Sequence, residues 1–261
     1  MTTRATNPKS AAWDLVGGQF WESGRRTAKP STAEIEQMTR GIPAGARCVV
    51  VGASTRDLVV ALLAHGARVM VLDFAERMCA DLRAALPPGA CPIHQHDITR
   101  TPPGELAGTQ DYVLSDRLIN RFSETEALPG LLGMTGLLAV GGEVRTSVKL
   151  GLYPMDERMI DLGRRRGCLA AFYDERQRVM NFAAAGEILE QALLPHGDIP
   201  AEVLLDWYRG RGTEKRFEHE DVVELFTNSA TRRGALRLLS GELLPDAPGT
   251  RLYIGRLEGQ A

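Results

Sequence analysis

The stretch Cys48–Asp73, CVVVGASTRDLVVALLAHGARVMVLD, decides the fold of this chain. It begins with four apolar, mostly β-branched residues, which is the pattern of a strand buried on both faces. Gly52 and the small residues after it permit a tight turn in which the backbone can approach a ligand closely. Apolar residues then recur at helical spacing as far as Gly66, and a second apolar strand ends at Asp73. The stretch therefore predicts a strand, turn, helix and strand in a parallel sheet.

Asp73 is the first candidate binding residue, because ligands of open parallel sheets bind beyond the carboxyl ends of the strands. A carboxylate in that position can accept hydrogen bonds from both hydroxyls of a ribose. Ser54 or Thr55 is expected to cap the helix, whose free N–H groups face the same crevice. A strand–helix–strand unit in which Asp73 merely caps a turn is the alternative interpretation.

These residues resemble the class I S-adenosylmethionine-dependent methyltransferases, in which a glycine-rich turn is followed by a G-A-x-V segment and an acidic residue. Gly52, Gly66-Ala67-Arg68-Val69 and Asp73 match that pattern, and the resemblance covers about residues 30 to 150. It implies an α/β, Rossmann-like fold with a mostly parallel seven-stranded sheet flanked by helices. It also implies S-adenosyl-L-methionine as cofactor, with S-adenosylhomocysteine or methylthioadenosine as product.

The resemblance also identifies expected cofactor-binding residues. Asp97 is expected to bond the adenine amino group, and Ile98 to offer its backbone N–H and apolar surface. Phe74 either lies against the adenine or packs under the following helix. The full expected set is Gly52, Ala53, Ser54, Asp57, Asp73, Phe74, Met78, Asp97, Ile98, Ser115 and Arg117.

Three positions depart from the family pattern, all around the methionine end of the cofactor. Ser54 and Arg56 stand where the second and third glycines usually occur, and Val50 replaces an acidic residue that usually helps to hold the methionine moiety. The resemblance therefore implies an ordinary adenosine site and an altered amino-acid site.

The segment after the fourth predicted strand, 111–114, is where the family places its catalytic or cofactor-facing loop. Ser115 or Asp116 is a candidate for contact with the methionine portion. Asn120 and Arg121 could reach the substrate or restore the contact to the cofactor carboxylate that the altered turn has lost; a capped amphipathic turn is the alternative. The predicted catalytic residues are Tyr153, Tyr173, Asn181 and Asn120.

Three regions are predicted around this core. Residues 1–40 form an N-terminal arm and a cap helix, for which Ser31 and Glu34 have capping-box spacing. Residues 41–261 form the methyltransferase-like domain, with a helical insertion covering the strand ends at about 151–210. Trp13 and Trp21 form either a satellite cluster or part of a lid over the substrate.

Composition narrows the expected environment and partners. The chain has 261 residues and a net charge of −2, which gives no general attraction to nucleic acid or anionic membranes. No apolar run approaches the roughly 20 residues of a membrane span, and no signal peptide is evident at the N-terminus. Scattered cysteines fit a reduced interior, and His94 and His96 lack a third ligand at useful spacing, so no metal site is predicted. We expect a cytoplasmic monomer or homodimer that acts on a small molecule.

Three functions remain open. The first is methyl transfer to a small, natural-product type molecule, since no Asn-Pro-Pro-Tyr motif follows the fourth strand. The second is cyclisation of S-adenosylmethionine to azetidine-2-carboxylic acid with release of methylthioadenosine, which the altered residues Val50, Ser54 and Arg56 suggest. The third is a non-catalytic binding subunit, which the retained Asp73 and Asp97 disfavour. A dehydrogenase ranks last, because the turn lacks the G-x-G-x-x-G glycines.

Overall fold

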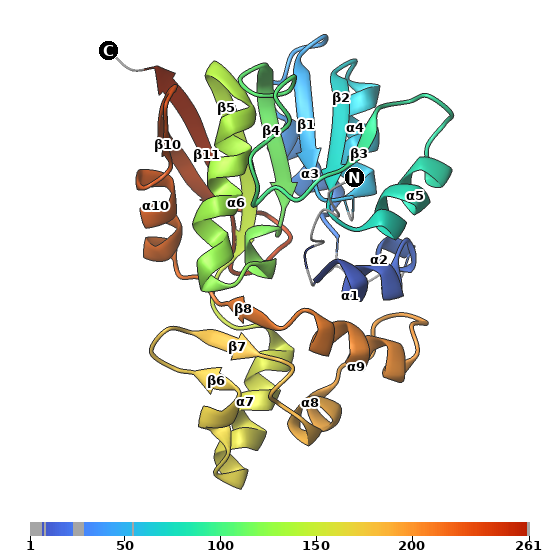
Figure 1. The fold of residues 1–261 in the computed structure, drawn as a ribbon, viewed down its shortest axis with the longest axis vertical. Helices are drawn as coiled ribbons and strands as arrows, with labels where there is room; N and C mark the ends of the chain where they lie inside the picture. Colours follow the sequence, from blue (N-terminus) through green and yellow to red (C-terminus); the bar gives the residue numbers. More distant parts are fainter. Residues whose placement is uncertain (1–6, 8, 23–28, 54, 260–261) are drawn as a thin grey trace, which may run out of the picture.

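The computed structural model describes residues 7, 9–22, 29–53 and 55–259, and its centre is a mostly parallel sheet (Figure 1). The strands lie in the order β3 (Ile93–Gln95), β2 (Arg68–Asp73), β1 (Arg47–Val51), β4 (Gln110–Asp116), β5 (Leu138–Lys149), β11 (Thr250–Gly259), β10 (Gly234–Leu243) and β9 (Ala230–Thr231). β1 pairs in parallel with β2 and β4, whereas β11 runs antiparallel to β5 and β10. The predicted Rossmann-like methyltransferase fold is confirmed. Eight strands replace the seven expected, because the two-residue β9 pairs with the start of β10.

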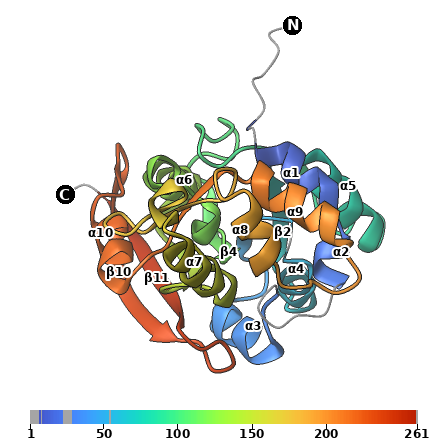
Figure 2. The same cartoon turned by 90° about the horizontal axis from the view of Figure 1, so that it is seen from below.

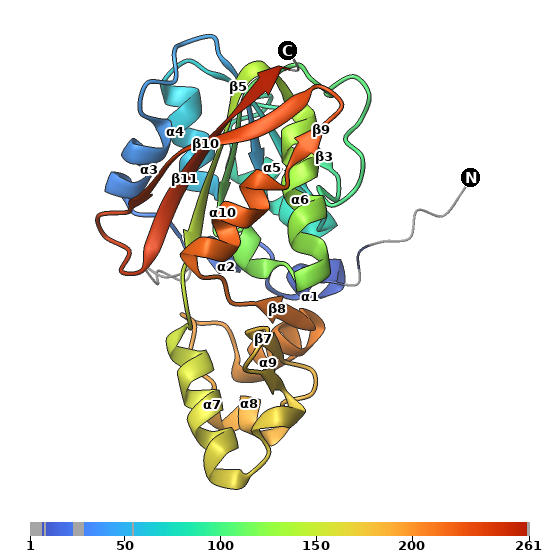
Figure 3. The ribbon, with the colours of Figure 1, turned by 90° about the vertical axis from the view of Figure 1, so that its left-hand side faces the viewer.

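Helices cover both faces of the sheet (Figure 3). One face carries α3 (Thr32–Thr39), α4 (Arg56–Ala64) and α5 (Glu76–Ala85), and the other carries α6 (Glu124–Leu137) and α10 (His219–Thr227). Residues 48–51 of β1 are all apolar because both faces of the strand are buried. Cys48 and Val50 belong to the core on one face of the sheet, and Val49 and Val51 belong to the core on the other. All four are at most 3% exposed, as expected of a strand buried on both sides.

A second, smaller layer lies beyond the carboxyl ends of the parallel strands (Figures 1 and 2). This layer, residues 154–215, is called the cover here. It contains α7 (Pro154–Arg166), β6 (Tyr173–Asp174), β7 (Val179–Asn181), α8 (Glu187–Ala192), α9 (Ala201–Gly210) and β8 (Thr213–Lys215), with a short 3₁₀ turn at Leu169–Ala171. The sequence predicts only helices over about 151–210; the structure adds a three-stranded antiparallel sheet, β6-β7-β8.

The N-terminal helices α1 (Lys9–Val16) and α2 (Gln19–Glu22) lie between the cover and the sheet, with α1 against α9 and α5 (Figure 2). Lys9 fixes α1 to both layers: its Nζ donates to the Arg121 carbonyl at 2.8 Å, to the Thr213 carbonyl at 3.1 Å and to Glu126 at 2.5 Å. The N-terminal helices are thereby held at the strand ends. No helix among the described residues is long and apolar enough to cross a membrane.

α6 approaches the strand-end segment closely because Gly133 lacks a side chain. A Cβ atom at Gly133 would lie 1.8 Å from the carbonyl oxygen of Ile98. The backbone of Ile98, which follows β3, is therefore held in place by its close contact with α6.

Candidate functional site

Two adjoining hollows lie between the sheet and the cover. The first, the strand-end crevice, is lined by residues from the N-terminal helices and the ends of β1 to β4: Trp13, Phe20, Gly52, Asp73, Phe74, Asp97, Ile98, Asp116, Arg117 and Arg121. The second, the cover cavity, is lined chiefly by Phe20, Arg121, Tyr153, Trp207, Tyr208, Arg211 and Arg216. Phe20 and Arg121 line both, so the two hollows meet at these side chains.

Asp73 lies at the centre of the crevice wall, at the end of β2. One carboxylate oxygen accepts a hydrogen bond from the Ala53 N–H at 2.7 Å, and the other accepts from the Ala75 N–H at 2.7 Å. Each oxygen keeps a second lone pair for another donor. Burial raises the pKa of Asp73 to about 6; the two N–H hydrogen bonds lower the pKa, but their effect is smaller than that of burial. Asp73 thus stiffens the turn after β1 and still has acceptor capacity for a ligand.

The turn itself is only partly described, since Ser54 lies outside the described residues. Gly52 has φ of +105°, a conformation that L side chains rarely adopt. The predicted cap by Thr55 is wrong: its hydroxyl donates back to the Gly52 carbonyl at 2.8 Å, and α4 has no side-chain cap there. This hydrogen bond links the two ends of the turn between β1 and α4.

The far end of the crevice contains Phe74, Asp97 and Ile98. Asp97 accepts from the N–H and hydroxyl of Thr99, at 3.0 and 2.7 Å, and from the Asn7 side-chain amide at 3.1 Å. Ile98 is 4% exposed and offers an apolar surface. A carboxylate, an aromatic ring and an apolar wall are thus together where an adenine is expected.

The opposite end of the crevice is charged. Arg117 donates to Asp116 at 2.7 Å and to Glu34 of α3 at 2.7 Å, and Ser147 donates to Asp116. Arg117 and Glu34 are both less than a tenth exposed. The predicted capping box at α3 is therefore only half formed: Ser31 accepts from the Glu34 N–H, but the Glu34 carboxylate pairs with Arg117.

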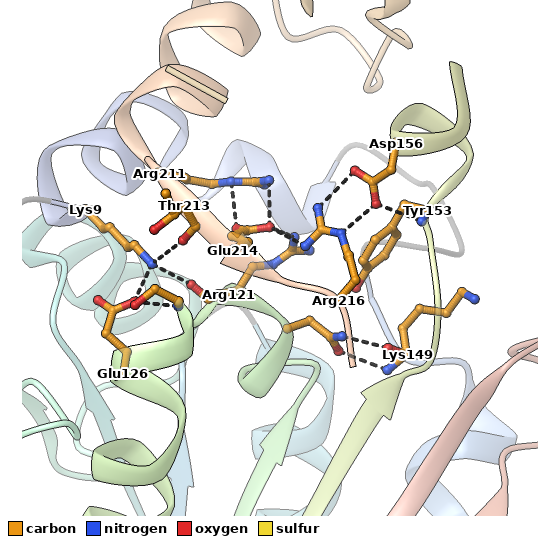
Figure 4. A network of polar contacts seen from close by, with 12 residues as sticks. Lys9, Arg121, Glu126, Lys149, Tyr153, Asp156, Arg211, Thr213, Glu214 and Arg216 are labelled. Carbon is orange, nitrogen blue, oxygen red and sulfur yellow. Dashed lines mark hydrogen bonds and ion pairs between the residues drawn. The ribbon is translucent and has the colours of Figure 1, made fainter. Parts of the chain in front are cut away.

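Figure 4 shows a buried network of arginines and carboxylates around the cover cavity. Glu214 of β8 forms ion pairs with Arg211, with Arg216 at 3.0 Å and with Arg121 at 3.6 Å. Arg216 also donates two bonds to Asp156 of α7, at 2.6 and 3.0 Å. Burial opposes ionisation of Glu214, but the three guanidinium groups outweigh it and lower its pKa to about 2. The network joins the cover to the loop after β4.

Tyr153 is the one predicted catalytic residue that lines this cavity. Two guanidinium groups lie near its ring, with the Cζ atoms of Arg216 and Arg121 at 5.0 and 5.6 Å from the ring centroid. Its hydroxyl is buried and finds no hydrogen-bond partner in the described part of the chain. Burial raises the pKa of Tyr153, although both arginines lower it, so the phenol is protonated at neutral pH.

The other three predicted catalytic residues are used elsewhere. The side-chain amide of Asn120 is bound to the backbone of Lys149, at 2.7 and 2.9 Å, where it holds the end of β5. Tyr173 packs in the cover's own core, and Asn181 accepts from the Ala184 N–H in a turn. Each of these side chains contacts the protein's own framework, and none of the three is part of the crevice or cavity wall.

Three predicted cofactor-binding residues also lie away from the crevice wall. Ser115 is fully buried and bonded to Thr146 at 2.8 Å, and Met78 is 1% exposed in the core beneath α5. Asp57 is ion-paired with Arg56 at 3.6 Å on the first turn of α4 and is partly exposed. Six described members of the predicted set line the crevice: Gly52, Asp73, Phe74, Asp97, Ile98 and Arg117. Ala53 is buried behind it and donates its N–H to Asp73.

Sequence reasoning missed Arg211, Glu214 and Arg216. They lie in the run RGRGTEKR (209–216), which reads as a polar surface segment. One signal was present: Glu214 and Arg216 are two residues apart, so in a strand they share a face. Of the two tryptophans predicted to form a satellite cluster or a lid, Trp13 lines the crevice and Trp21 is buried in the core without lining it. Trp13 and Phe20 pack on Trp207, with ring centroids 5.3 and 5.5 Å away.

No protein-family model and no curated protein matches the chain by sequence. Among solved structures, a Rhodobacter sphaeroides protein bearing the provisional name Zn-dependent alcohol dehydrogenase is 46% identical, with a TM-score of 0.93 over 97% of this chain and 100% of that one. At that identity the two chains belong to one family. Within the described ranges of this chain, no group of three or more His, Cys, Asp or Glu side chains is arranged to hold a metal ion.

More distant structures have the same fold. The CcbJ methyltransferase of Streptomyces caelestis has a TM-score of 0.64 at 12% identity, over 96% of this chain and 99% of its own. The 1,6-didemethyltoxoflavin-N1-methyltransferase of Burkholderia thailandensis, solved with S-adenosylhomocysteine, has a TM-score of 0.58 at 12% identity, over 99% and 93%. At 12% identity, these two structures show that the chain shares their fold.

Proposed function

We propose that this chain, which has the fold of class I S-adenosylmethionine-dependent methyltransferases, transfers a methyl group to a small organic acceptor held in the cover cavity. The single observation that carries the proposal is the meeting of crevice and cavity at Phe20 and Arg121. A cofactor at the strand ends and an acceptor under the cover would be neighbours there.

The described residues fit S-adenosylmethionine. Asp73, with a free lone pair on each oxygen, would accept from the ribose hydroxyls, and Asp97 with Ile98 and Phe74 would hold the adenine. Val50 is fully buried in the sheet, so the methionine end would instead meet Asp116, Arg117 and Arg121. When bound, the cofactor supplies a methyl group made electrophilic by its sulfonium.

The protein's own contribution is orientation and exclusion of water. Trp13 and Phe20 from the N-terminal helices and Trp207 from the cover pack together over the junction, with centroids 5.1 to 5.5 Å apart. Such an apolar wall would keep water from the junction. Charged side chains around it would fix the acceptor's orientation.

The experiment is incubation of the purified protein with S-adenosylmethionine, alone and with a panel of small acceptors, followed by mass spectrometry. S-adenosylhomocysteine that appears only with an acceptor, together with a product heavier by one methylene, supports methyl transfer. Methylthioadenosine appearing without acceptor would instead support cyclisation. Bound cofactor with no turnover by any acceptor would favour a binding subunit.

Cyclisation and hydride transfer receive less support. Cyclisation is suggested by the altered residues Val50, Ser54 and Arg56, but it also needs a polar and aromatic pocket that bends the methionyl chain. Of Tyr153, Tyr173 and Asn181, which could form such a pocket, only Tyr153 lines the cavity. Alcohol dehydrogenase activity, suggested by the name of the Rhodobacter relative, is not proposed because the turn after β1 lacks the G-x-G-x-x-G glycines that a dinucleotide requires.

A further inference from the structure

The cover cavity contains buried hydrogen-bond donors that have nothing to donate to. Within the described ranges, Tyr153 Oη, Trp207 Nε1 and Arg211 Nη1 are buried without a hydrogen-bond partner. Trp207 and Arg211 are 3% and 2% exposed, and all three side chains line the cavity. A buried donor without a partner costs free energy, so three around one cavity indicate that a ligand supplies the acceptors.

The charges of the network favour an anion. Arg121, Arg211 and Arg216 face Asp156 and Glu214, which is three positive charges against two negative ones and leaves one positive charge in excess. Burial lowers the pKa of Arg211 to about 10, which still leaves it charged at neutral pH. An uncompensated buried charge is unfavourable, and a ligand carboxylate would neutralise it.

The walls of the cavity favour a flat ring. Phe20, Tyr153, Trp207 and Tyr208 line it, and the Cζ of Arg211 lies 4.1 Å and 4.4 Å from the ring centroids of Trp207 and Tyr208. The volume of the cavity is about 140 Å³. An engineered protein cavity of about 150 Å³ binds benzene, so one small ring fits.

We infer that the methyl acceptor is a small aromatic acid whose anionic oxygens are held by Arg211, Trp207 and Tyr153. This inference rests on the proposed function, in which the cover cavity holds the acceptor. Specificity then comes from a requirement for charge and for hydrogen-bond acceptors: a neutral ring of the same size leaves the donors unsatisfied, which disfavours its binding.

The test is calorimetric titration of benzoate and of benzamide, its neutral counterpart, with and without S-adenosylhomocysteine. Benzoate is expected to bind at least tenfold more tightly than benzamide. Trp207→Phe and Tyr153→Phe each remove one donor atom and keep an aromatic ring, so each should weaken benzoate binding at least threefold. Arg211→Met should lose the preference for benzoate.

Arg209→Gln is the matched control, because Arg209 lies in the last turn of α9, two residues before Arg211, but is partly exposed and paired with Glu190 at 2.6 Å. It should bind benzoate like the wild type. Equal affinities for benzoate and benzamide, absence of benzoate binding, or unchanged binding by both phenylalanine variants would each overturn the inference. Benzoate selectivity in a protein that fails to bind S-adenosylhomocysteine would keep the anion site and overturn the proposed function instead.

Discussion

Glu214→Gln removes the carboxylate at the centre of the buried network without changing its size. The pKa of Glu214 falls from an ordinary value of 4.5 to about 2 in the folded protein. That difference corresponds to about 3 kcal/mol of folding free energy at neutral pH, since each pKa unit is worth about 1.4 kcal/mol. We therefore expect Glu214→Gln to lower the free energy of unfolding by about 3 kcal/mol at pH 7, near the cost of breaking a buried ion pair.

The assay is urea denaturation followed by circular dichroism at pH 7 and at pH 3.5. The folded-state pKa is depressed, so the stability that the ionised Glu214 supplies is fully present above about 4.5 and is lost as the pH falls toward 2. The difference between wild type and variant should therefore be smaller at pH 3.5 than at pH 7. Glu220→Gln, on the first turn of α10 and outside the network, is the control and should change stability by less than about 0.5 kcal/mol.

A loss below about 1 kcal/mol at pH 7, or the same loss at both pH values, would refute this reasoning. Either result would mean that the three arginines do not depend on Glu214 for their charge balance.

The remaining predictions concern the crevice and the helices that support it. Because the pKa of Asp73 is about 6 in the folded protein and the ionised carboxylate is the better acceptor, affinity for S-adenosylhomocysteine should rise between pH 5 and pH 7, and calorimetry on Asp73→Asn should give a flat profile. The same raised pKa makes this group's contribution to stability decrease as the pH rises from about 4 to 6, since the folded state then binds more protons than the unfolded state. Gly133→Ala should destabilise by about 1–3 kcal/mol in urea denaturation, because its Cβ would lie 1.8 Å from a backbone oxygen; Gly136→Ala, facing only the Pro102 ring at 3.3 Å, should cost less. Lys9→Met should cost about 1–2 kcal/mol and weaken cofactor binding measured by calorimetry, because Lys9 anchors the helix that brings Trp13 to the crevice.

The strand–helix–strand unit was predictable because its signals are local. β1, α4 and β2 begin and end within about one residue of the ranges expected from apolar spacing, and Gly66 ends the helix with φ of +78°. Asp73 follows from the same reasoning, since its place depends only on the end of β2.

The cover cavity was not predictable, because its residues come together only through tertiary packing. Tyr173 is polar and lies within the predicted insertion, yet the β6–β7 pairing puts it in the cover's own core. Arg211 is charged and flanked by glycine, yet it is enclosed by three aromatic rings from α9 and the segment after β7. Glu34 shows the same limit: its N–H follows the capping rule, but its carboxylate is taken by Arg117, 83 residues away.

The central claim is that the strand-end crevice binds S-adenosylmethionine through Asp73. Calorimetric titration of S-adenosylhomocysteine into the wild type, Asp73→Ala and Asp57→Ala tests it most directly, with circular dichroism to show that each variant is folded. We expect the wild type and Asp57→Ala to bind alike, since Asp57 lies on α4 outside the crevice wall, and Asp73→Ala to bind at least tenfold more weakly, about 1.4 kcal/mol or more. No binding by the wild type, or equal affinity of folded Asp73→Ala, would contradict the account.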